Sequence, residues 1–180
     1  MADKINPEFK FIPDYADLIA SIASGWATIE YYVNHSIWIV ADLDAPTGAC
    51  VTSQIHSLNS KLSSLLSLLK LYQAPDRIIK RVNRFADTIR GPQEHRNRVI
   101  HDVWLIDNVN SGSMGRLETT AAKRLEFTVK DVSIEKLRAI YDELSASRLE
   151  FFHIRNDIFK ERPTFSGIPE SERDPTATIR

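Results

Sequence analysis

The chain has 180 residues, and its 43% hydrophobic content is enough for one buried core of ordinary domain size. Its 23 basic and 24 acidic residues give a formal charge of −1, which excludes a polycation that binds nucleic acid over its whole surface. The single cysteine excludes an internal disulfide and a cysteine-based zinc site. No apolar run reaches the length of a membrane span or follows a secretory pattern, so we expect a cytoplasmic protein.

The N-terminal part of the chain has the apolar period of a long helix. Apolar side chains recur every three or four positions at Tyr15, Leu18, Ile19, Ile22, Trp26, Ile29, Val33, Ile37 and Val40. Asp14 and Asp17 favour a helix start, because the first turn attracts negative charge. We therefore predict a helix over residues 14–43, ended by turn residues at 44–48.

The next segment has a heptad pattern. Its two series of apolar residues are Ile55, Leu62 and Leu69, and Leu58, Leu65 and Tyr72. Leu66, Leu68 and Leu71 widen the apolar surface, so this helix fits two neighbours, or one neighbour and a second subunit. Pro75 ends it, and we expect Asp76 to cap a third helix that carries Ile78, Ile79, Val82, Phe85, Ala86 and Ile89.

The second half of the chain changes its period. A kink or tight restart at Gly91-Pro92 leads into a short helix that reaches about His101. After Asp102 the apolar period changes to two residues, and a turn-rich stretch follows at 110–115. This pattern predicts two or three antiparallel strands over about 102–130. Ser133 is a natural N-cap for a last helix that runs to about residue 160.

These elements predict a mainly α fold. We expect an antiparallel up-down bundle of four to five helices, with a small antiparallel β-sheet inserted before the last long helix. Residues 1–162 form one domain in this prediction. The proline-containing tail 163–180 is extended or docked on another subunit, since it has little apolar material to offset its ordering entropy.

Charge is unevenly distributed along the chain. Residues 1–60 have a formal charge of −5, whereas residues 76–101 carry seven basic and three acidic side chains, a charge of +4. An anionic partner such as RNA would bind this basic segment, through Arg81, Arg84, Arg90 and Arg98. The alternative is that the acidic and basic segments neutralise each other within the bundle.

The six residues from Arg96 to His101 have the pattern R-N-x-x-x-H. Histidine exchanges protons near neutral pH, arginine binds phosphate oxygens with a planar fork, and Asn97 can donate to phosphate or hold the histidine in one tautomer. Five helical steps separate Arg96 and His101 by about 140°, so they converge only if the helix ends at His101. Alternatively, both simply cap a helix end, where the dipole favours cations.

With Trp104 after the histidine and Trp26-x-x-x-Glu30 in the first helix, this motif resembles the HEPN superfamily. The resemblance implies a helical homodimer that places two motifs face to face as a metal-independent endoribonuclease of a toxin, defence or stress type. Arg96, Asn97 and His101 would be catalytic, and Glu30 would be a carboxylate behind them. The Leu58–Leu71 helix and the first helix would supply the dimer interface.

The resemblance also implies partners and an alternative. The partners are RNA and, for a toxin, a cognate antitoxin or another protein; no cofactor or metal is expected. His95 and His101 lie six residues apart, which is the wrong spacing for a shared metal on one helical face. Many members of the superfamily bind RNA or a protein without cutting, so a non-catalytic binding dimer of the same fold remains the alternative.

Overall fold

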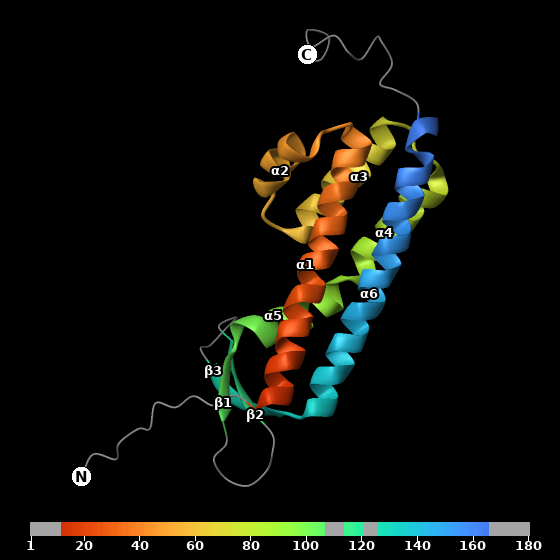
Figure 1. Ribbon diagram of the computed structural model, residues 1–180. Coiled ribbons are helices and arrows are strands. Elements are labelled where there is room, and N and C mark those ends of the chain that lie inside the picture. The colour runs from red at the N-terminus through yellow and green to blue at the C-terminus, as the bar shows by residue number, and fades with distance from the viewer. Residues whose placement is uncertain (1–11, 107–113, 121–125, 166–180) are drawn as a thin grey trace, which may run out of the picture. The chain divides into compact units, whose positions relative to one another are not determined.

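The computed structural model describes residues 12–106, 114–120 and 126–165. These residues form six α-helices, three strands and a short 3₁₀ helix, which confirms a mainly helical chain with a small antiparallel sheet before its last long helix (Figure 1). They belong to two compact units. The first unit takes its residues from 1–25 and 91–145, and the second from 26–90 and 146–180.

The bounds of the elements follow the chain. They are α1 Pro13–Ala41, α2 Ala45–Ser53, α3 Leu58–Leu71, α4 Asp76–Thr88, α5 Arg90–His101, β1 Val103–Ile106, β2 Met114–Thr120, β3 Glu126–Val132, α6 Ile134–Glu161 and the 3₁₀ helix η1 Arg162–Thr164. The described part of the chain thus has one helix more than the four to five predicted, and the additional one is α2.

The predicted apolar stripe of α1 is buried, with only Leu18 and Ile19 partly exposed. The helix stops at Ala41, two residues before the predicted end, because Asp42 adopts a left-handed backbone with φ of 56°. The amide of Leu43 then donates to the Trp38 carbonyl at 2.9 Å, which closes the helix end.

The helix α2 corrects our prediction of a turn at 44–48. Asp44 Oδ1 accepts from the Thr47 amide at 2.8 Å, and Pro46 lies in the first turn, where its missing N–H costs nothing. A side chain at Gly48 would come within 2.4 Å of the Trp38 ring, so glycine is needed here for close packing against α1.

In the second unit, α3 and α4 lie side by side (Figure 1). Both helices contribute buried apolar side chains to the core. The helix α3 begins at Leu58 behind the N-cap Ser57, so Ile55 precedes it, and its four buried leucines confirm the heptad prediction. The rings of Phe85 and Phe151, from α4 and α6, lie 4.8 Å apart between centroids, and both are fully buried.

The boundary between α4 and α5 is a tight restart, as predicted, since Ile89 alone separates the two helices. The helix α5 starts at Arg90, so Pro92 lies in its first turn. Asp76 is the first residue of α4 rather than its cap, because Pro75 occupies the N-cap position and no side chain caps the helix.

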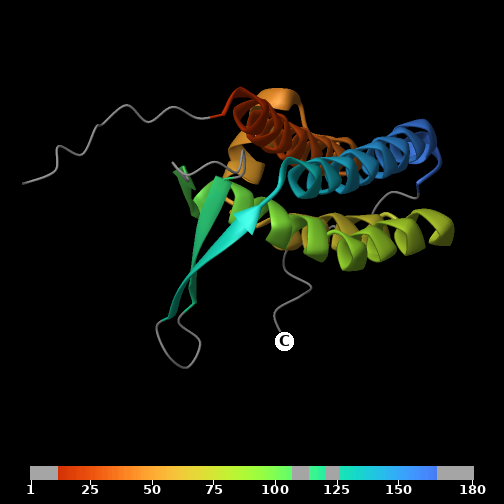
Figure 2. The same cartoon turned by 90° about the horizontal axis from the view of Figure 1, so that it is seen from below.

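In the first unit, the strands pair in the order β1-β2-β3, all antiparallel. Met114 and Gly115 open β2 instead of belonging to the predicted turn, which otherwise lies outside the described residues. The register sends Trp104, Met114 and Val132 to one face, where all three are buried. Figure 2 shows β3 running toward the start of α6.

The helix α6 begins behind Ser133, whose Oγ accepts from the Lys136 amide at 3.3 Å, as the sequence predicts. In the second unit, the predicted tail begins with η1 and with Phe165, which is buried. Arg162 Nε donates to the carbonyls of Ile39 and Val40, at 3.1 and 3.0 Å. Residues 166–180 of the predicted tail lie outside the described residues. Among the described helices, none has the length and apolar character of a membrane span.

Candidate functional site

The R-N-x-x-x-H side chains meet at the C-terminal end of α5, in the first unit. The helix ends at His101 and β1 begins at Val103, so the break required for convergence is present. Arg96 Nη1 donates to Asn97 Oδ1 at 3.0 Å and lies 3.5 Å from His101 Nε2. Asn97 and His101 are exposed and Arg96 is partly exposed, so the group is open to an approaching ligand.

The contact with Arg96 constrains the chemistry of the imidazole. A guanidinium has donors only, so His101 Nε2 can interact favourably with Arg96 only through its lone pair. An imidazole whose Nε2 carries a lone pair is also the form that can remove a proton from a substrate hydroxyl.

Trp104 fixes the end of α5. Its Nε1 donates to the Val99 carbonyl at 2.8 Å, and this carbonyl would otherwise have no partner within the helix. The Trp104 ring packs edge-on against Tyr15 from α1, with centroids 6.1 Å apart. Tyr15 in turn donates its hydroxyl to the Val132 carbonyl at 2.6 Å. Trp104 thereby anchors β1, the strand that follows His101, to α5, the helix that carries His101.

A series of charged side chains in contact, which we call the charged ladder, runs from the end of α5 across the sheet. Asp102 lies 3.7 Å from Arg98 and 3.4 Å from Arg116, whose side chain is only 9% exposed. Arg116 also pairs with Glu118, and Glu118 Oε2 lies 2.6 Å from Lys130 Nζ. The hydrogen bond from Lys130, together with Arg116, holds the pKa of Glu118 below its usual value. Arg98, which we predicted to bind RNA, is thus one member of this ladder.

A second histidine on α5 has a carboxylate partner. His95 Nδ1 lies 2.8 Å from Glu143 Oε2 on α6, and both side chains are about half exposed. Among the described residues, no cluster of three or more histidine, cysteine, aspartate or glutamate side chains has the arrangement of a metal site. The pair therefore fastens α5 to α6 within the first unit.

The other predicted site residues belong to the second unit. Arg81 pairs with Asp157 of α6, and Arg90 lies 3.7 Å from Asp87. Arg84 is exposed and has no carboxylate partner within the described ranges. Glu30 is partly buried on α1, directly after the buried Ile29. The roles predicted for these four side chains stay predictions.

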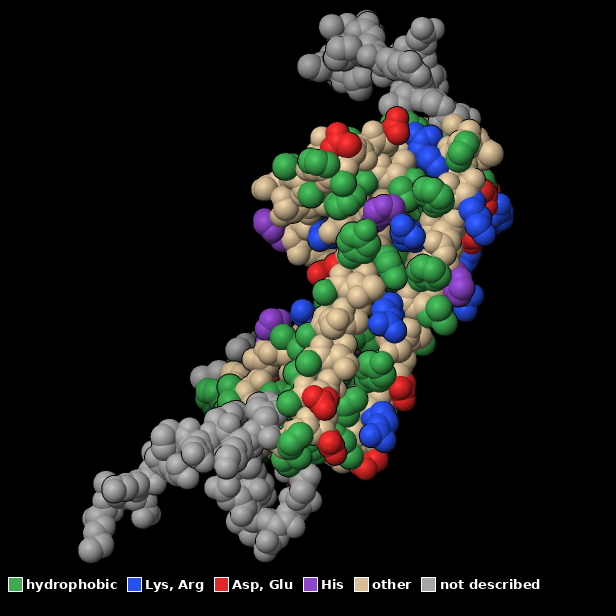
Figure 3. Space-filling view, viewed as in Figure 1, with side chains coloured by type: hydrophobic (Ala, Val, Ile, Leu, Met, Phe, Trp, Pro, Cys, Tyr) green, Lys and Arg blue, Asp and Glu red, His purple; other side chains and the backbone are tan. Residues whose placement is uncertain are grey.

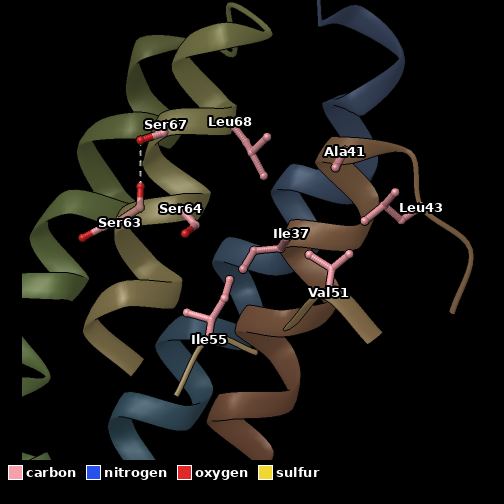
Figure 4. Close-up of a pocket in the computed structure, with 9 residues that line it drawn as sticks. All are labelled: Ile37, Ala41, Leu43, Val51, Ile55, Ser63, Ser64, Ser67 and Leu68. Atoms are coloured by element: carbon pink, nitrogen blue, oxygen red, sulfur yellow. Dashed lines mark hydrogen bonds between the residues drawn. The ribbon is translucent and has the colours of Figure 1, made fainter. Parts of the chain in front are cut away.

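The second unit also has an apolar pocket between α1, α2 and α3, with a volume of about 500 Å³. Ile37, Val51, Ile55 and Leu68 point into it, and its lining has no charged side chain (Figure 4). Ser67 on its rim donates to the Ser63 carbonyl, so this hydroxyl forms its hydrogen bond within its own helix. The pocket has the character of a packing defect, with no group suited to acid, base or nucleophilic chemistry.

Sequence reasoning missed the residues that position the motif. The ladder needs the strand register, and the His95–Glu143 contact joins residues 48 positions apart. The available signal was the alternation of Arg116 and Glu118, which places both on one face of a strand.

Comparisons with known proteins give no relative: no family model, no curated protein and no solved structure matches the chain. The function is therefore argued from the geometry at the end of α5 and from the charges around it.

Proposed function

We propose that the chain is a HEPN-like, metal-independent endoribonuclease of a toxin, defence or stress type, which acts as a homodimer. The observation that carries the proposal is the contact of Arg96 with both Asn97 and His101 at the point where α5 ends. This contact unites a phosphate-binding cation, an orienting amide and a proton-transfer group on an exposed surface.

The chemistry that fits these groups is attack of a ribose 2′-hydroxyl on the adjacent phosphorus. His101 removes the hydroxyl proton, the 2′-oxygen bonds to phosphorus, and the bond to the 5′-oxygen breaks. A second imidazole protonates the departing 5′-oxygen, which leaves a 2′,3′-cyclic phosphate and a 5′-hydroxyl. Arg96 stabilises the extra negative charge on the phosphate oxygens in the transition state.

One imidazole cannot serve as base and acid in the same step. His95 is on the same helix, but six helical steps place it about 120° around the helix from His101. The second copy of the chain therefore supplies the acid, which is the reason why the proposal includes a homodimer. Asn97 keeps the Arg96 fork beside His101, so that both reach one phosphate. An antitoxin or other protein partner would control such an enzyme by covering this surface.

The test is incubation of the purified protein with RNA in the presence of EDTA. The wild type should produce fragments with 2′,3′-cyclic phosphate ends, and His101→Ala should lower the rate by about 100-fold or more. His153→Ala is the matched control, since His153 is also exposed and lies on α6. An inactive wild type, or equal cleavage by His101→Ala, refutes the enzyme. RNA binding without any product would instead support the non-catalytic alternative.

A further inference from the structure

The six basic side chains of residues 70–90, in the second unit, fall into two sets. Arg77 pairs with Glu161, Arg81 with Asp157, and Arg90 lies near Asp87. Figure 3 shows positive and negative side chains next to each other over α6. By contrast, Lys70, Lys80 and Arg84 have no carboxylate partner in the described part of the chain, and all three are exposed.

The unpaired set lines one groove. Lys70 on α3 and Lys80 and Arg84 on α4 surround a cavity of about 400 Å³ between the two helices. Asn83 adds an amide, and Asp87, the one acid of the lining, already lies beside Arg90. Like charges four residues apart destabilise a helix. Lys80 and Arg84 therefore repel each other weakly, and an anion between them would relieve this repulsion.

The floor of the groove is apolar. Leu66 of α3 and Ile79 of α4 complete the lining, so the cavity offers an apolar surface next to three cations. Its volume falls within the range of small-molecule sites and exceeds the space that a single phosphate ion fills. A nucleotide has the matching chemistry, because its phosphate is anionic and its base and sugar carry flat or apolar surfaces.

We propose that this α3–α4 groove binds a nucleotide unit of an RNA strand. The phosphate lies against Lys70, Lys80 and Arg84, and the base or sugar covers Leu66 and Ile79. Naming RNA rests on the proposed function, but the groove belongs to the second unit and uses none of the motif residues. It assigns RNA contact to Lys70, Lys80 and Arg84, whereas Arg81 and Arg90 serve the fold.

The experiment is a titration of a labelled single-stranded RNA followed by fluorescence anisotropy in EDTA. The double variant Lys80→Ala/Arg84→Ala should raise Kd about tenfold. It should also flatten the dependence of log Kd on log salt by about 1.4, since each lost contact with single-stranded RNA contributes about 0.7. The control is Arg77→Ala/Lys160→Ala, which removes the same charge from two exposed positions outside the groove and should change Kd by less than about twofold.

Equal weakening by both double variants would show that only net charge matters, and it would overturn the groove. No weakening by Lys80→Ala/Arg84→Ala would overturn it as well. If adenosine monophosphate binds as tightly as the RNA, the occupant is a free nucleotide and the RNA assignment is wrong. Repeating the titration with His101→Ala separates the two proposals, because the groove uses none of the motif residues. The Kd of His101→Ala should equal that of the wild type, whether or not the wild type cleaves RNA.

A second observation concerns the sheet of the first unit. The register places Val103, Leu117 and Val129 in one row across the three strands, on the face opposite Trp104. Leu105 and Phe127 share this face, and it also carries Gly115, Thr119 and Asp131. Val103, Phe127 and Val129 are 55%, 62% and 56% exposed. We call the five apolar side chains of this face the outer apolar face.

We infer that the outer apolar face binds a second copy of the chain. Its exposed surface amounts to roughly 400 Å² per copy, comparable to the largest apolar patch of a typical monomer. Two such faces bury roughly 800 Å², less than the roughly 1,200 Å² of the smallest stable interfaces, so the predicted dimer is weak. Among the described residues of the face, Asp131 alone is charged, so self-association meets little like-charge repulsion there. The face begins at Val103, two residues after His101. An interface at this face would therefore bring the second copy of the chain close to the proposed composite site.

Light scattering after size-exclusion chromatography tests this interface without RNA. The wild type should have twice the mass of the chain at high concentration, and Phe127→Lys/Val129→Lys should be monomeric. The control Leu149→Lys/Phe159→Lys changes two equally exposed apolar residues of α6 and should remain a dimer. A monomeric wild type, a dimeric sheet variant or a monomeric control each overturns the assignment. None of these results depends on cleavage.

Discussion

The helices α4 and α5 follow each other in the chain and are both rich in arginine, yet they use it differently. Arg77 and Arg81 of α4 contact carboxylates of α6, so their charges are neutralised within the second unit. Arg96 of α5 instead contacts an amide and an imidazole of its own helix, Asn97 and His101. The comparison teaches that the charge of +4 over residues 76–101 does not itself locate a site. A site is located by the kind of side chain that each arginine contacts.

The largest expected effect separates these two roles. Arg96→Ala should lower the rate of RNA cleavage by about 100- to 1,000-fold, because it removes the cation that stabilises the transition state. Its free energy of unfolding should change little. Arg81→Ala should do the reverse, with a loss of up to about 1 kcal/mol of stability and no loss of cleavage. Similar effects of both substitutions on both quantities would break the comparison.

The second-largest expected effect is a difference in stability between variants of Arg116 and Arg90, which both have carboxylate partners. Arg116 is buried between Asp102 and Glu118, so Arg116→Met removes one of the two cations beside each of these nearly buried carboxylates and should cost about 2 kcal/mol. Arg90→Met breaks an exposed contact and should change stability by no more than about 0.5 kcal/mol. Urea unfolding measures both. A cost for Arg90→Met that equals that of Arg116→Met would contradict the role given to burial.

A smaller effect should follow from the hydrogen bond that holds the end of α5. Trp104→Phe keeps a ring against Tyr15 but leaves the Val99 carbonyl without its donor, which should cost about 1 kcal/mol of stability. Because the last turn carries His101, cleavage should also slow. The control is Trp38→Phe, which removes a hydrogen bond to Thr52 in the second unit. If Trp38→Phe slows cleavage equally, Trp104 has no specific positioning role.

Local signals were sufficient to predict several elements. The α1 stripe and the α3 heptads follow from periodicity, and Ser133 was identified because its hydroxyl can accept from the first turn of α6. The end of α5 was predicted from the change to a two-residue period at Val103, and this is also the reason why the convergence of Arg96 and His101 was foreseeable.

The remaining elements needed tertiary information. Asp44, Pro46 and Gly48 are turn formers, but they are equally the residues of a helix start, and only the packing of Trp38 on Gly48 decides for α2. In the same way, composition does not tell which arginines are neutralised, because Arg81 and Asp157 are 76 residues apart.

The smallest expected effect is a dependence of stability on pH, and it belongs to the second unit. Burial, with a contribution from the charge of Arg155, lowers the pKa of His35. Arg155 Nε donates to His35 Nδ1 at 3.2 Å, a contact that requires the neutral ring. The unfolded chain therefore takes up a proton near pH 6.5 that the folded chain resists, so this contribution to stability is complete above about pH 6.5 and is lost as the pH falls below it.

His35→Gln isolates this contribution. Between pH 7 and 5, its free energy of unfolding should fall less than that of the wild type, as measured by urea unfolding at each pH. The carboxylates are common to both proteins, so the difference between the two curves reports His35. Parallel curves would show that His35 takes up its proton equally in both states.

The most direct test of the central claim is the rate of RNA cleavage in EDTA by an equimolar mixture of His101→Ala and Arg96→Ala chains. If two motifs form one composite site, mixed dimers carry one intact imidazole and one intact guanidinium. The account then predicts that wild type is active, that each variant alone loses at least about 100-fold, and that mixing does not restore the wild-type rate, since the step needs two imidazoles. Recovery of the wild-type rate in the mixture, or full activity of His101→Ala by itself, would contradict the account.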